Sequence, residues 1–392
     1  MTVAERPAAA SRVMTGPSIF AEMSALALQH GAVNLGQGFP DFAGPAAVKT
    51  AAIEAIAADH NQYARMAGLP ALASAIADTA SLHHGRRIDP ATEVTVFSGA
   101  TEALFCSILA LCEAGDEVVL LEPFYDSYLA AVRLAGAIPR IVTLHADRSF
   151  RFDPAELHAA FGPRTRAVLV NTPHNPTGRV LEEGELSALA AEVRRTGAYV
   201  IADEVYEHIV FDGRHRSIAT LPGLEGRTAT ISSSGKTFSL TGWKVGWAVA
   251  PPEISAALRG VHQFVTFATA TPLQHAIAAA LSAPRTYYEE LAADYRARRD
   301  RLSGTLAAVG LCPFPVQGTY FVIGDARRLG WDDDVAFCRF LVEVAGVAAI
   351  PLSAFYESRQ RGSALVRFAF CKRDETLAEA DRRLRGRPLR RP

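Results

Sequence analysis

Residues 230–246 read TISSSGKTFSLTGWKVG and place two lysines, Lys236 and Lys244, among small and hydroxyl-bearing side chains. The preceding TATI segment, 228–231, is typical of a short strand. Small neighbours leave room beside Lys236 for a flat group, and a lysine with a lowered pKa is suited to form a Schiff base. The hydroxyls and the second cation are suited to bind a phosphate. A serine-rich surface loop with solvated lysines explains the same residues equally well, so this segment alone leaves both interpretations open.

The composition excludes several classes of protein. The chain has 392 residues, of which 49% are hydrophobic and 21% charged, and its formal net charge is −1. These values are typical of a globular protein with a large core, and they indicate neither nucleic acid nor a membrane surface as a partner. Its five cysteines include no Cys-x-x-Cys pair, which favours a reducing compartment over disulfides or zinc.

The N-terminus, MTVAERPAAASRVM, lacks the apolar core of a signal peptide, and no apolar run reaches the length of a membrane span. We therefore expect a cytoplasmic protein. The histidines are scattered without metal-ligand spacing, so the sequence predicts no metal site.

Short strands alternate with helices through the middle of the chain. The expected strands, rich in β-branched residues and bounded by Gly or Pro, are 94–97, 117–121, 138–143, 166–171, 199–202, 228–232 and 247–250. This alternation predicts an α/β fold with a mostly parallel sheet between two layers of helices.

The C-terminal part has a different pattern. A long charged helix is expected at 285–309, with the arginine-rich run 296–301 on a solvated face. Further strands are expected at 318–323, 347–351 and 365–370, with helices at 333–345 and 375–384. The predicted organisation is a large domain of residues 45–284 and a small α+β domain formed by residues 1–44 and 285–392.

Polar and aromatic residues follow the ends of the expected strands of the large domain. Because ligands of parallel α/β sheets bind beyond the carboxyl ends of strands, these residues are predicted to share one site. They are Ser98 and Gly99, Tyr125, Asn175, Asp203, Tyr206 and Lys236. Gly99 also stands between a strand and a helix, where free peptide N–H groups and the helix dipole favour an anion.

Each of these residues has an ordinary alternative role. Asp203 is suited to pair with a protonated ring nitrogen, and a surface carboxylate is the alternative. Tyr206 and Asn175 are suited to hydrogen-bond a ring oxygen, and packing or a turn explains them as well. Tyr125 is suited to stack on a ring face, or to pack in the core.

Arg367 lies inside the apolar segment LVRFAF. An unpaired arginine is costly in a core, so we expect a carboxylate partner. A substrate carboxylate bound by two hydrogen bonds and a structural ion pair both satisfy this requirement. The serine run near Lys236 lacks the Gly-x-Ser-x-Gly pattern, which disfavours a serine hydrolase.

Taken together, these segments resemble a known family. SGATEALF, EPFYDSY, NTPHNPTG, DEVYEH, SSGKTFSLTGWKVGW and VRFAFCK are similar to motifs of the class I pyridoxal-phosphate aminotransferases of fold type I. NLGQGFPDF, HQFVTFATATPLQ and GVAAIPLSAFY resemble the kynurenine aminotransferase, glutamine transaminase K and methionine aminotransferase subgroup in particular. The resemblance runs from about residue 17 to residue 384.

The resemblance implies a role for each cofactor residue. Lys236 would form the Schiff base with pyridoxal 5'-phosphate and shuttle the proton, and Asp203 would pair with the pyridine nitrogen. Tyr206 and Asn175 would bind the phenolic oxygen, and Tyr125 would stack on the ring. The phosphate would be held by Gly99, Ala100, Ser233 and Lys244, with Thr101 as a further cofactor-binding residue.

The resemblance also implies a homodimer with active sites shared across its interface. Tyr63 would reach the phosphate of the neighbouring subunit. Arg367 would bind the α-carboxylate of the substrate, next to Gly36 and Asn175. Phe267 and Ala268 would contact the substrate side chain in the partner's site, and some relatives carry histidine in place of Ala268.

The expected reaction is transamination between a neutral L-amino acid and a 2-oxo acid, with Lys236 carrying out a 1,3-proton shift. The expected donors are aromatic or sulfur-containing, in the manner of glutamine, methionine or kynurenine. Alternatives are β- or γ-elimination or replacement on the same cofactor, and a succinyl-diaminopimelate aminotransferase. A non-enzymatic regulator is disfavoured because the motif residues are all retained.

Overall fold

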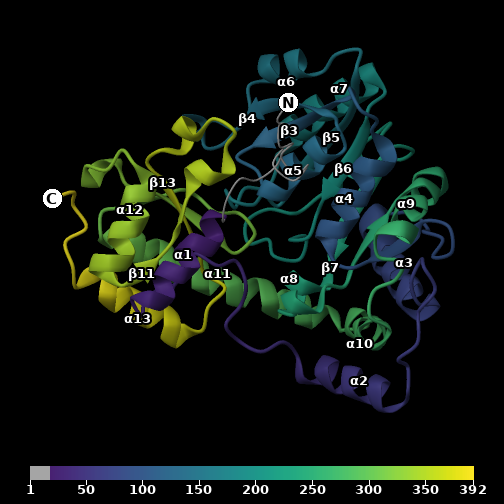
Figure 1. Ribbon diagram of the computed structural model, residues 1–392, viewed down its shortest axis with the longest axis horizontal. Coiled ribbons are helices and arrows are strands. Elements are labelled where there is room, and N and C mark those ends of the chain that lie inside the picture. The colour runs from purple at the N-terminus through teal and green to yellow at the C-terminus, as the bar shows by residue number, and fades with distance from the viewer. Residues whose placement is uncertain (1–17) are drawn as a thin grey trace, which may run out of the picture.

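The computed structural model describes residues 18–392. Its central feature is a seven-stranded sheet with the order β2-β8-β7-β6-β5-β3-β4 (Figure 1). The strands are β2 (Val94–Phe97), β3 (Glu117–Glu122), β4 (Ile138–Thr143), β5 (Thr165–Asn171), β6 (Tyr199–Asp203), β7 (Thr228–Ser233) and β8 (Gly246–Val249). Only β8 is antiparallel to its neighbours β2 and β7. The predicted α/β fold with a mostly parallel sheet is confirmed.

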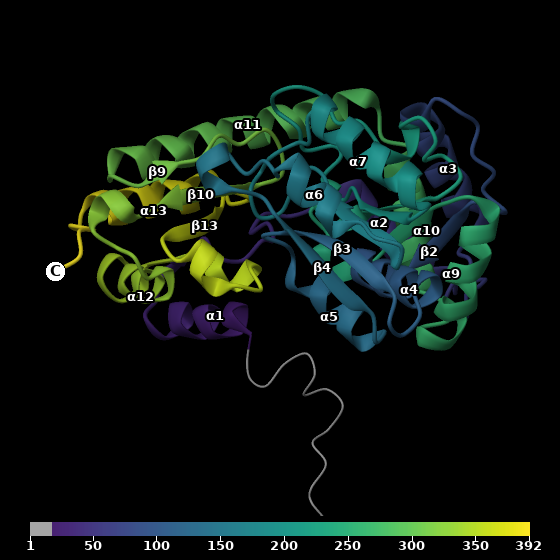
Figure 2. The same cartoon turned by 90° about the horizontal axis from the view of Figure 1, so that it is seen from above.

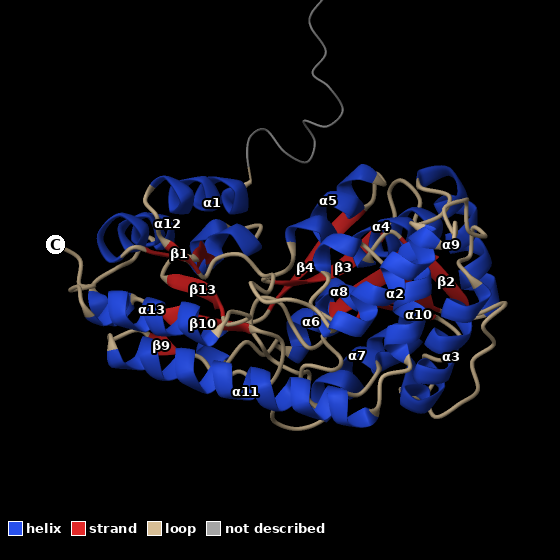
Figure 3. Ribbon diagram, turned by 90° about the horizontal axis from the view of Figure 1, so that it is seen from below, coloured by secondary structure: helices blue, strands red, loops and turns tan. Residues whose placement is uncertain are grey.

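Helices cover both faces of this sheet, as Figure 3 shows. Successive strand residues point to opposite faces, so Ile201 packs with one helical layer and Val200 with the other. The first layer is α4 (Ala100–Leu111), α5 (Asp126–Leu134) and α9 (Pro252–Val265). The second includes α6 (Pro154–Ala160) and α7 (Glu183–Thr196). Burial on both faces explains why the central strands are continuously apolar.

Three more helices pack against the end of the sheet formed by β2 and β8. They are α2 (Ala46–Ala57), α3 (Pro70–His84) and α10 (Thr271–Leu281). Their apolar side chains share a core cluster with Val96 of β2 and Trp247 of β8. Residues that follow α2 and precede α10, including Tyr63 and Phe267, are thereby brought together on one surface.

The remaining elements form a second group around a four-stranded antiparallel sheet, β12-β13-β10-β9. These strands are β9 (Cys312–Pro313), β10 (Phe321–Asp325), β12 (Ile350–Pro351) and β13 (Leu365–Ala369). Helices α1 (Ile19–Gln29), α12 (Asp334–Phe340) and α13 (Asp374–Arg385) lie around it, and α11 (Arg285–Ala308) runs along one side (Figure 2). The division into two domains at the stated boundaries stays a prediction.

The expected single strand at 347–351 is wrong in detail. It consists of two short strands, because the chain changes partner at Ala349. β11 (Val347–Ala348) pairs with β1 (Val33–Asn34), whereas β12 pairs with β13. The preceding helix, expected at 333–345, likewise ends in a π-helical turn, Leu341–Ala345. This arrangement joins the N-terminal segment to the C-terminal elements.

The expectation that the arginine-rich run of α11 faces solvent is wrong for two residues. The side chains of Arg298 and Arg299 are only 14% exposed. Arg298 lies over the ring of Phe42 at 4.5 Å, and Arg299 lies over Phe211 at 5.1 Å. Arg299 also donates to the carbonyl oxygen of Val316 at 2.8 Å. Their aliphatic stems cover apolar surface while the guanidinium groups bind backbone and carboxylate oxygens.

Within residues 18–392, no helix has both the length and the apolar character that crossing a membrane requires. The longest helix of this part, α11, carries charged residues between Arg285 and Arg301. The cytoplasmic location stays a prediction.

The packing of α11 generates a stability prediction. Arg299→Ala is expected to destabilise the fold by about 1–3 kcal/mol, because it removes charged hydrogen bonds and the packing over Phe211. Arg301, with 41% of its side chain exposed, is the matched control on the same helix, and Arg301→Ala should leave stability almost unchanged. Thermal unfolding of both variants measures the difference, and equal midpoints would show that Arg299 contributes no more than a solvated arginine.

Candidate active site

A cavity of about 500 Å³ opens at one edge of the seven-stranded sheet. Because β2 and β7 are both antiparallel to β8, they are parallel to one another, and their carboxyl ends meet those of β3, β5 and β6. Eleven of the predicted residues line the cavity: Gly99, Ala100, Thr101, Tyr125, Asn175, Asp203, Tyr206, Ser233, Lys236, Lys244 and Arg367. Residues from distant parts of the sequence thus form one site, as expected from the strand ends.

Lys236 lies in α8 (Ser234–Thr237), directly after β7. Its Nζ atom is 5.7 Å from the ring centre of Tyr206 and 5.6 Å from that of Tyr320. Burial lowers the pKa of Lys236 to about 8. At neutral pH a much larger fraction of this amine is therefore neutral than for a solvated lysine, which suits both nucleophilic attack and proton transfer.

Asp203 ends β6 and is 4% exposed. Burial raises the pKa of its carboxyl to about 6, against the opposing effect of the hydroxyl of Tyr128. That hydroxyl donates to Oδ2 at 2.5 Å, while the peptide N–H of Val205 donates to Oδ1 at 3.4 Å. The carboxylate is thus held in place by two donors on its own subunit. It is ionised above about pH 6 and suited to stabilise a cation in the cavity.

Tyr128 was missed by the sequence analysis. It follows Tyr125 by three residues at the start of α5, so both side chains lie on one side of the helix, with ring centres 5.7 Å apart. This spacing in the segment YDSY was the available signal. Tyr128 is 3% exposed, and it acts on the cavity through Asp203.

Arg367 of β13 lines the same cavity and is 3% exposed. Its Nη1 donates to Asn175 Oδ1 at 2.9 Å and its Nη2 to the carbonyl oxygen of Gly36 at 3.0 Å. The guanidinium also lies over the ring of Phe321 at 4.0 Å and that of Phe355 at 4.7 Å.

The charge of Arg367 has no counter-ion in the part of the chain that the structure describes. No carboxylate there lies within 4.0 Å of it, and its buried Nε has no hydrogen-bond partner. Burial lowers its pKa to about 10, so it remains cationic at neutral pH. The structural ion pair considered from the sequence is therefore not found, and the geometry favours an external carboxylate.

The turn between β2 and α4 has the form of an anion site. Gly99 has a φ of +86°, and a Cβ placed on it would come within 3.1 Å of the Lys244 Nζ. Gly246 of β8 packs on the same turn, where a Cβ would lie 2.6 Å from the peptide nitrogen of Ala100. The absence of side chains at both glycines brings the start of α4 close to Lys244 and Ser233, and N–H groups at a helix start favour a phosphate.

Five predicted site residues do not line the cavity of their own chain. The N–H of Ser98 donates to the carboxylate of Glu102. Gly36 contributes its carbonyl oxygen to Arg367 instead. Tyr63 is 88% exposed and Phe267 is 40% exposed, and their rings meet edge to face at 5.6 Å. Ala268 lies beside them in sequence and is half-buried. None of these last three residues lines the cavity of the chain to which it belongs.

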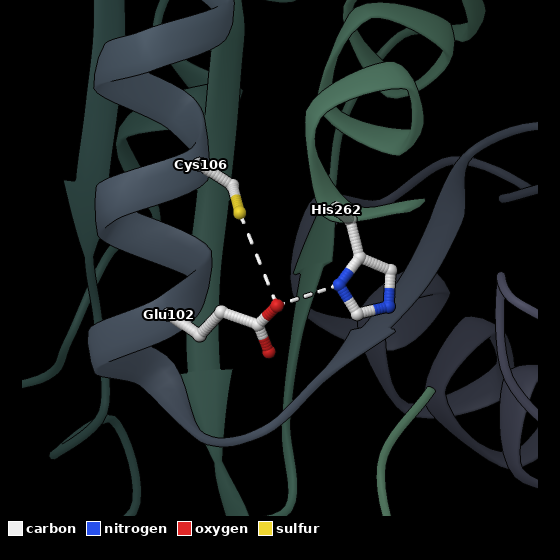
Figure 4. Close-up of side chains that lie close together, drawn as sticks. All are labelled: Glu102, Cys106 and His262. Atoms are coloured by element: carbon white, nitrogen blue, oxygen red, sulfur yellow. Dashed lines mark hydrogen bonds and ion pairs between the residues drawn. The ribbon is translucent and has the colours of Figure 1, made fainter. Parts of the chain in front are cut away.

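Glu102, Cys106 and His262 come close enough together to be considered as metal ligands (Figure 4). The oxygens of Glu102 are already engaged, one by the N–H of Ser98 at 2.5 Å and the other by Nδ1 of His262 at 2.7 Å. Burial raises the pKa of the Cys106 thiol to about 12, so the thiol is protonated beside the pair. We interpret the group as a buried hydrogen-bonded pair, which sequence spacing did not indicate because its members come from two helices.

The pKa of Lys236 generates a prediction for the cofactor-free protein. Reductive methylation with ¹³C-formaldehyde labels the amines, and the chain has only four lysines, so their NMR signals are readily resolved. The Lys236 signal is expected to titrate at about pH 8, changing from the protonated form below to the neutral form above. The signal is assigned to Lys236 because it is absent from the spectrum of the Lys236→Ala variant. A midpoint near 10.5 would show that the amine is solvated rather than buried.

Comparison with known proteins agrees with this geometry. Residues 31–384 match the family model of aminotransferase class I and II. The chain is 48% identical to a probable N-succinyldiaminopimelate aminotransferase of Mycobacterium tuberculosis over 94% of this chain and 95% of that protein. It is 44% identical to the methionine aminotransferase of Escherichia coli, covering 94% and 96%. It is 41% identical to a kynurenine–oxoglutarate transaminase of Dictyostelium discoideum, covering 93% of each.

Solved structures show the same relationship. The N-succinyldiaminopimelate aminotransferase of Mycobacterium tuberculosis superposes with a TM-score of 0.93, covering 97% of this chain and 99% of that one. An aspartate aminotransferase of Thermus thermophilus, 33% identical, superposes with a TM-score of 0.89, covering 97% and 98%. The subgroup expected from the sequence is represented among these relatives. From its family match, its relatives and its fold, this chain belongs to the class I and II aminotransferases, pyridoxal-phosphate-dependent enzymes of fold type I.

Proposed function

We propose that this enzyme transfers the amino group of a neutral L-amino acid to a 2-oxo acid. The proposal depends on two side chains that line the same cavity. The guanidinium of Arg367 is buried and has no carboxylate partner among the described residues. The pKa of the Lys236 amine is lowered to about 8. Arg367 would hold the α-carboxylate of either substrate. Lys236 would remove the proton from the adjacent carbon.

Pyridoxal 5'-phosphate fits the residues of the cavity. Asp203 would face the pyridine nitrogen, and its ionised carboxylate would keep that nitrogen protonated. Tyr125 would stack on the ring, and Tyr206 and Asn175 would bind the ring oxygen. The phosphate would lie at the start of α4, at Gly99, Ala100 and Thr101, with Ser233 and Lys244 beside it. Support for this assignment comes from the glycine-lined turn and from the buried carboxylate at the end of β6.

When bound, the cofactor supplies an electron sink for the carbon from which the proton is removed. The remaining work belongs to the chain. Lys236, whose pKa is about 8, accepts and returns a proton without a large energetic penalty. Arg367 and the ring of Phe321 fix the substrate carboxylate and exclude water beside it. Lys236 and Arg367 would thereby orient the substrate in the cavity.

The cavity lining favours a neutral donor. Its cations are Lys236, Lys244 and Arg367, and each already has a proposed partner. The remaining wall includes Phe20, Phe39 and Phe321. A side-chain carboxylate would find no further cation among these lining residues, whereas an aromatic or thioether side chain would find apolar surface. The relatives named for methionine and kynurenine agree with this class.

N-succinyldiaminopimelate is the second candidate donor, favoured by the 48% identity to the Mycobacterium tuberculosis protein of that name. Its distal carboxyl groups would need cations that the lining residues of a single chain do not supply. The two candidates differ in the charge of the donor side chain, so a donor panel separates them.

We also propose a homodimer. Large apolar side chains are exposed around Tyr63 and Phe267, namely Ile53, Ile56, Phe264 and Val265. An apolar surface of this kind on a globular chain marks an interface. If a second copy covers it, Tyr63, Phe267 and Ala268 are available to the partner's cavity, which accounts for their absence from their own.

The test of the main proposal is a single half-reaction. The enzyme loaded with pyridoxal phosphate is mixed with methionine, glutamine, kynurenine, phenylalanine, N-succinyldiaminopimelate or aspartate, without any oxo acid. Pyridoxamine phosphate, measured by chromatography, is expected in amounts matching the subunits with the neutral donors. Ammonia with unchanged cofactor would indicate elimination. Reaction with N-succinyldiaminopimelate alone would select the second candidate, and reaction with aspartate alone would reject the neutral donor class.

The phosphate turn generates a separate prediction. Gly246→Ala places a methyl group against the peptide nitrogen of Ala100 and displaces the turn, so the dissociation constant for pyridoxal phosphate is expected to rise at least about tenfold. Gly242→Ala is the matched control, because a Cβ there meets nothing within 4 Å. Equilibrium titration of both variants measures the effect. Equal affinities would place the phosphate away from this turn.

A further inference from the structure

The segment 266–270 connects α9 to α10 and is hydrogen-bonded at its start to the last turn of α9 and near its end to the backbone of Lys244. At its start, the N–H groups of Thr266 and Phe267 donate to the carbonyl oxygen of His262 at 3.1 and 3.0 Å. At its end, the hydroxyl of Thr269 donates to the carbonyl oxygen of Lys244 at 3.3 Å. Phe267 between them has a φ of +70°, so its backbone conformation depends on these attachments.

The imidazole of His262 links this segment to the phosphate turn. His262 is fully buried, and its Nδ1 pairs with Glu102 Oε1 at 2.7 Å (Figure 4). The second oxygen of Glu102 accepts the N–H of Ser98, the first residue of the turn, at 2.5 Å. One carboxylate thus binds the turn on one side and the origin of the segment on the other.

The hydrogen bonds that Glu102 accepts stabilise its ionised form. Burial raises the pKa of Glu102, but the hydrogen bonds from His262 and from the Ser98 N–H more than compensate, and the pKa lies below its ordinary value. An ionised carboxylate in a buried position requires its donors, so loss of the imidazole leaves a charge that lacks one of them.

The other face of the segment points outward. The side chains of Phe267 and of Tyr63, which it contacts, do not line the cavity of their own chain. The segment therefore presents Phe267, together with Tyr63, to whatever covers that surface. In the proposed dimer this is the cavity of the second copy.

We propose that Glu102 and His262 are positioning residues that hold segment 266–270 in place, so that the phosphate turn of one subunit sets the geometry of the substrate pocket of the other. This inference rests on the proposed dimer with shared sites. It assigns the pair a role across the interface, although both residues lie deep inside one chain.

Hybrid dimers test the assignment. Two differently tagged subunits are co-expressed and the mixed dimer purified, with Lys236→Ala in one subunit so that only the other retains a working lysine. In the trans hybrid, His262→Leu is placed in the Lys236→Ala subunit. In the cis hybrid, His262→Leu is placed in the subunit with the intact lysine. The hybrid carrying Lys236→Ala alone is the reference.

The trans hybrid is expected to show a KM for the amino donor about tenfold above the reference, with kcat and the affinity for pyridoxal phosphate little changed, because the intact site receives a misplaced Phe267. The cis hybrid is expected to keep the reference KM and to bind pyridoxal phosphate more weakly. His262→Asn in the trans hybrid should restore most of the KM, since its amide retains a donor for Glu102. Cys106→Ser is the matched control, because serine retains a donor at the position where the thiol makes a long hydrogen bond of 4.0 Å to Glu102 Oε1.

A KM that rises in the cis hybrid alone would overturn the proposal, since the pair would then act within its own subunit. An equal rise in the cis and trans hybrids would overturn it too, since the substitution would then act on folding or on the dimer as a whole. An unchanged KM in both would overturn it as well. Failure of the proposed function looks different. A reference hybrid without donor activity, or a chain that light scattering shows to be monomeric, would remove the shared site itself.

Discussion

The position of one reversed strand governs the active-site cavity. β8 lies between β2 and β7 and runs against both, so the carboxyl ends of β2 and β7 meet at the same edge. The connection from β7 to β8 must therefore turn back at that edge, and it carries Lys236 and Lys244 on its way. The first residue of β8, Gly246, packs against the turn after β2. Sheet topology, rather than any local motif, brings the amine and the anion site together.

The cavity concentrates ionisable groups that a folded protein otherwise separates. Burial raises the pKa of Asp203, lowers that of Lys236 and lowers that of Arg367. Each shift reflects a charge that lacks water and is incompletely paired within its own chain. A cofactor and a substrate that carry matching charges relieve this cost, so binding and stability are linked. The charged groups of the cavity are thus arranged to bind charged ligands.

Much of the fold and most of the site were predictable from sequence because the signals are local. β-branched strands bounded by Gly or Pro indicated the sheet, and polar or aromatic residues within four positions of an expected strand end identified Asp203, Tyr125 and Lys236. Arg367 stood out as a charge in an apolar strand. A further signal was overlooked: among 40 basic residues only four are lysines, and two of these stand in the segment 230–246.

What escaped prediction depends on contacts between distant segments. Tyr128 matters only because Asp203, 75 positions away, lies at the end of its hydroxyl. The Glu102–His262 pair joins two helices that the sequence separates by 160 residues. Arg298 and Arg299 look like solvated charges until Phe42 and Phe211 are seen beneath them. Periodicity describes one element at a time, and none of these relationships belongs to a single element.

The contact between Gly99 and Gly246 has a consequence for how such an enzyme can change. Gly99 and Gly246 have no side chains, and a Cβ at either position would lie too close to neighbouring atoms. A larger residue therefore does not fit at this part of the cavity. Phe20 and Phe39 also line the cavity and are only partly buried, so their side chains can change in size or polarity without adding atoms to a filled space. Preference for a different amino donor can therefore arise by substitution of the phenylalanine lining, whereas the contact between Gly99 and Gly246 restricts change at the phosphate turn.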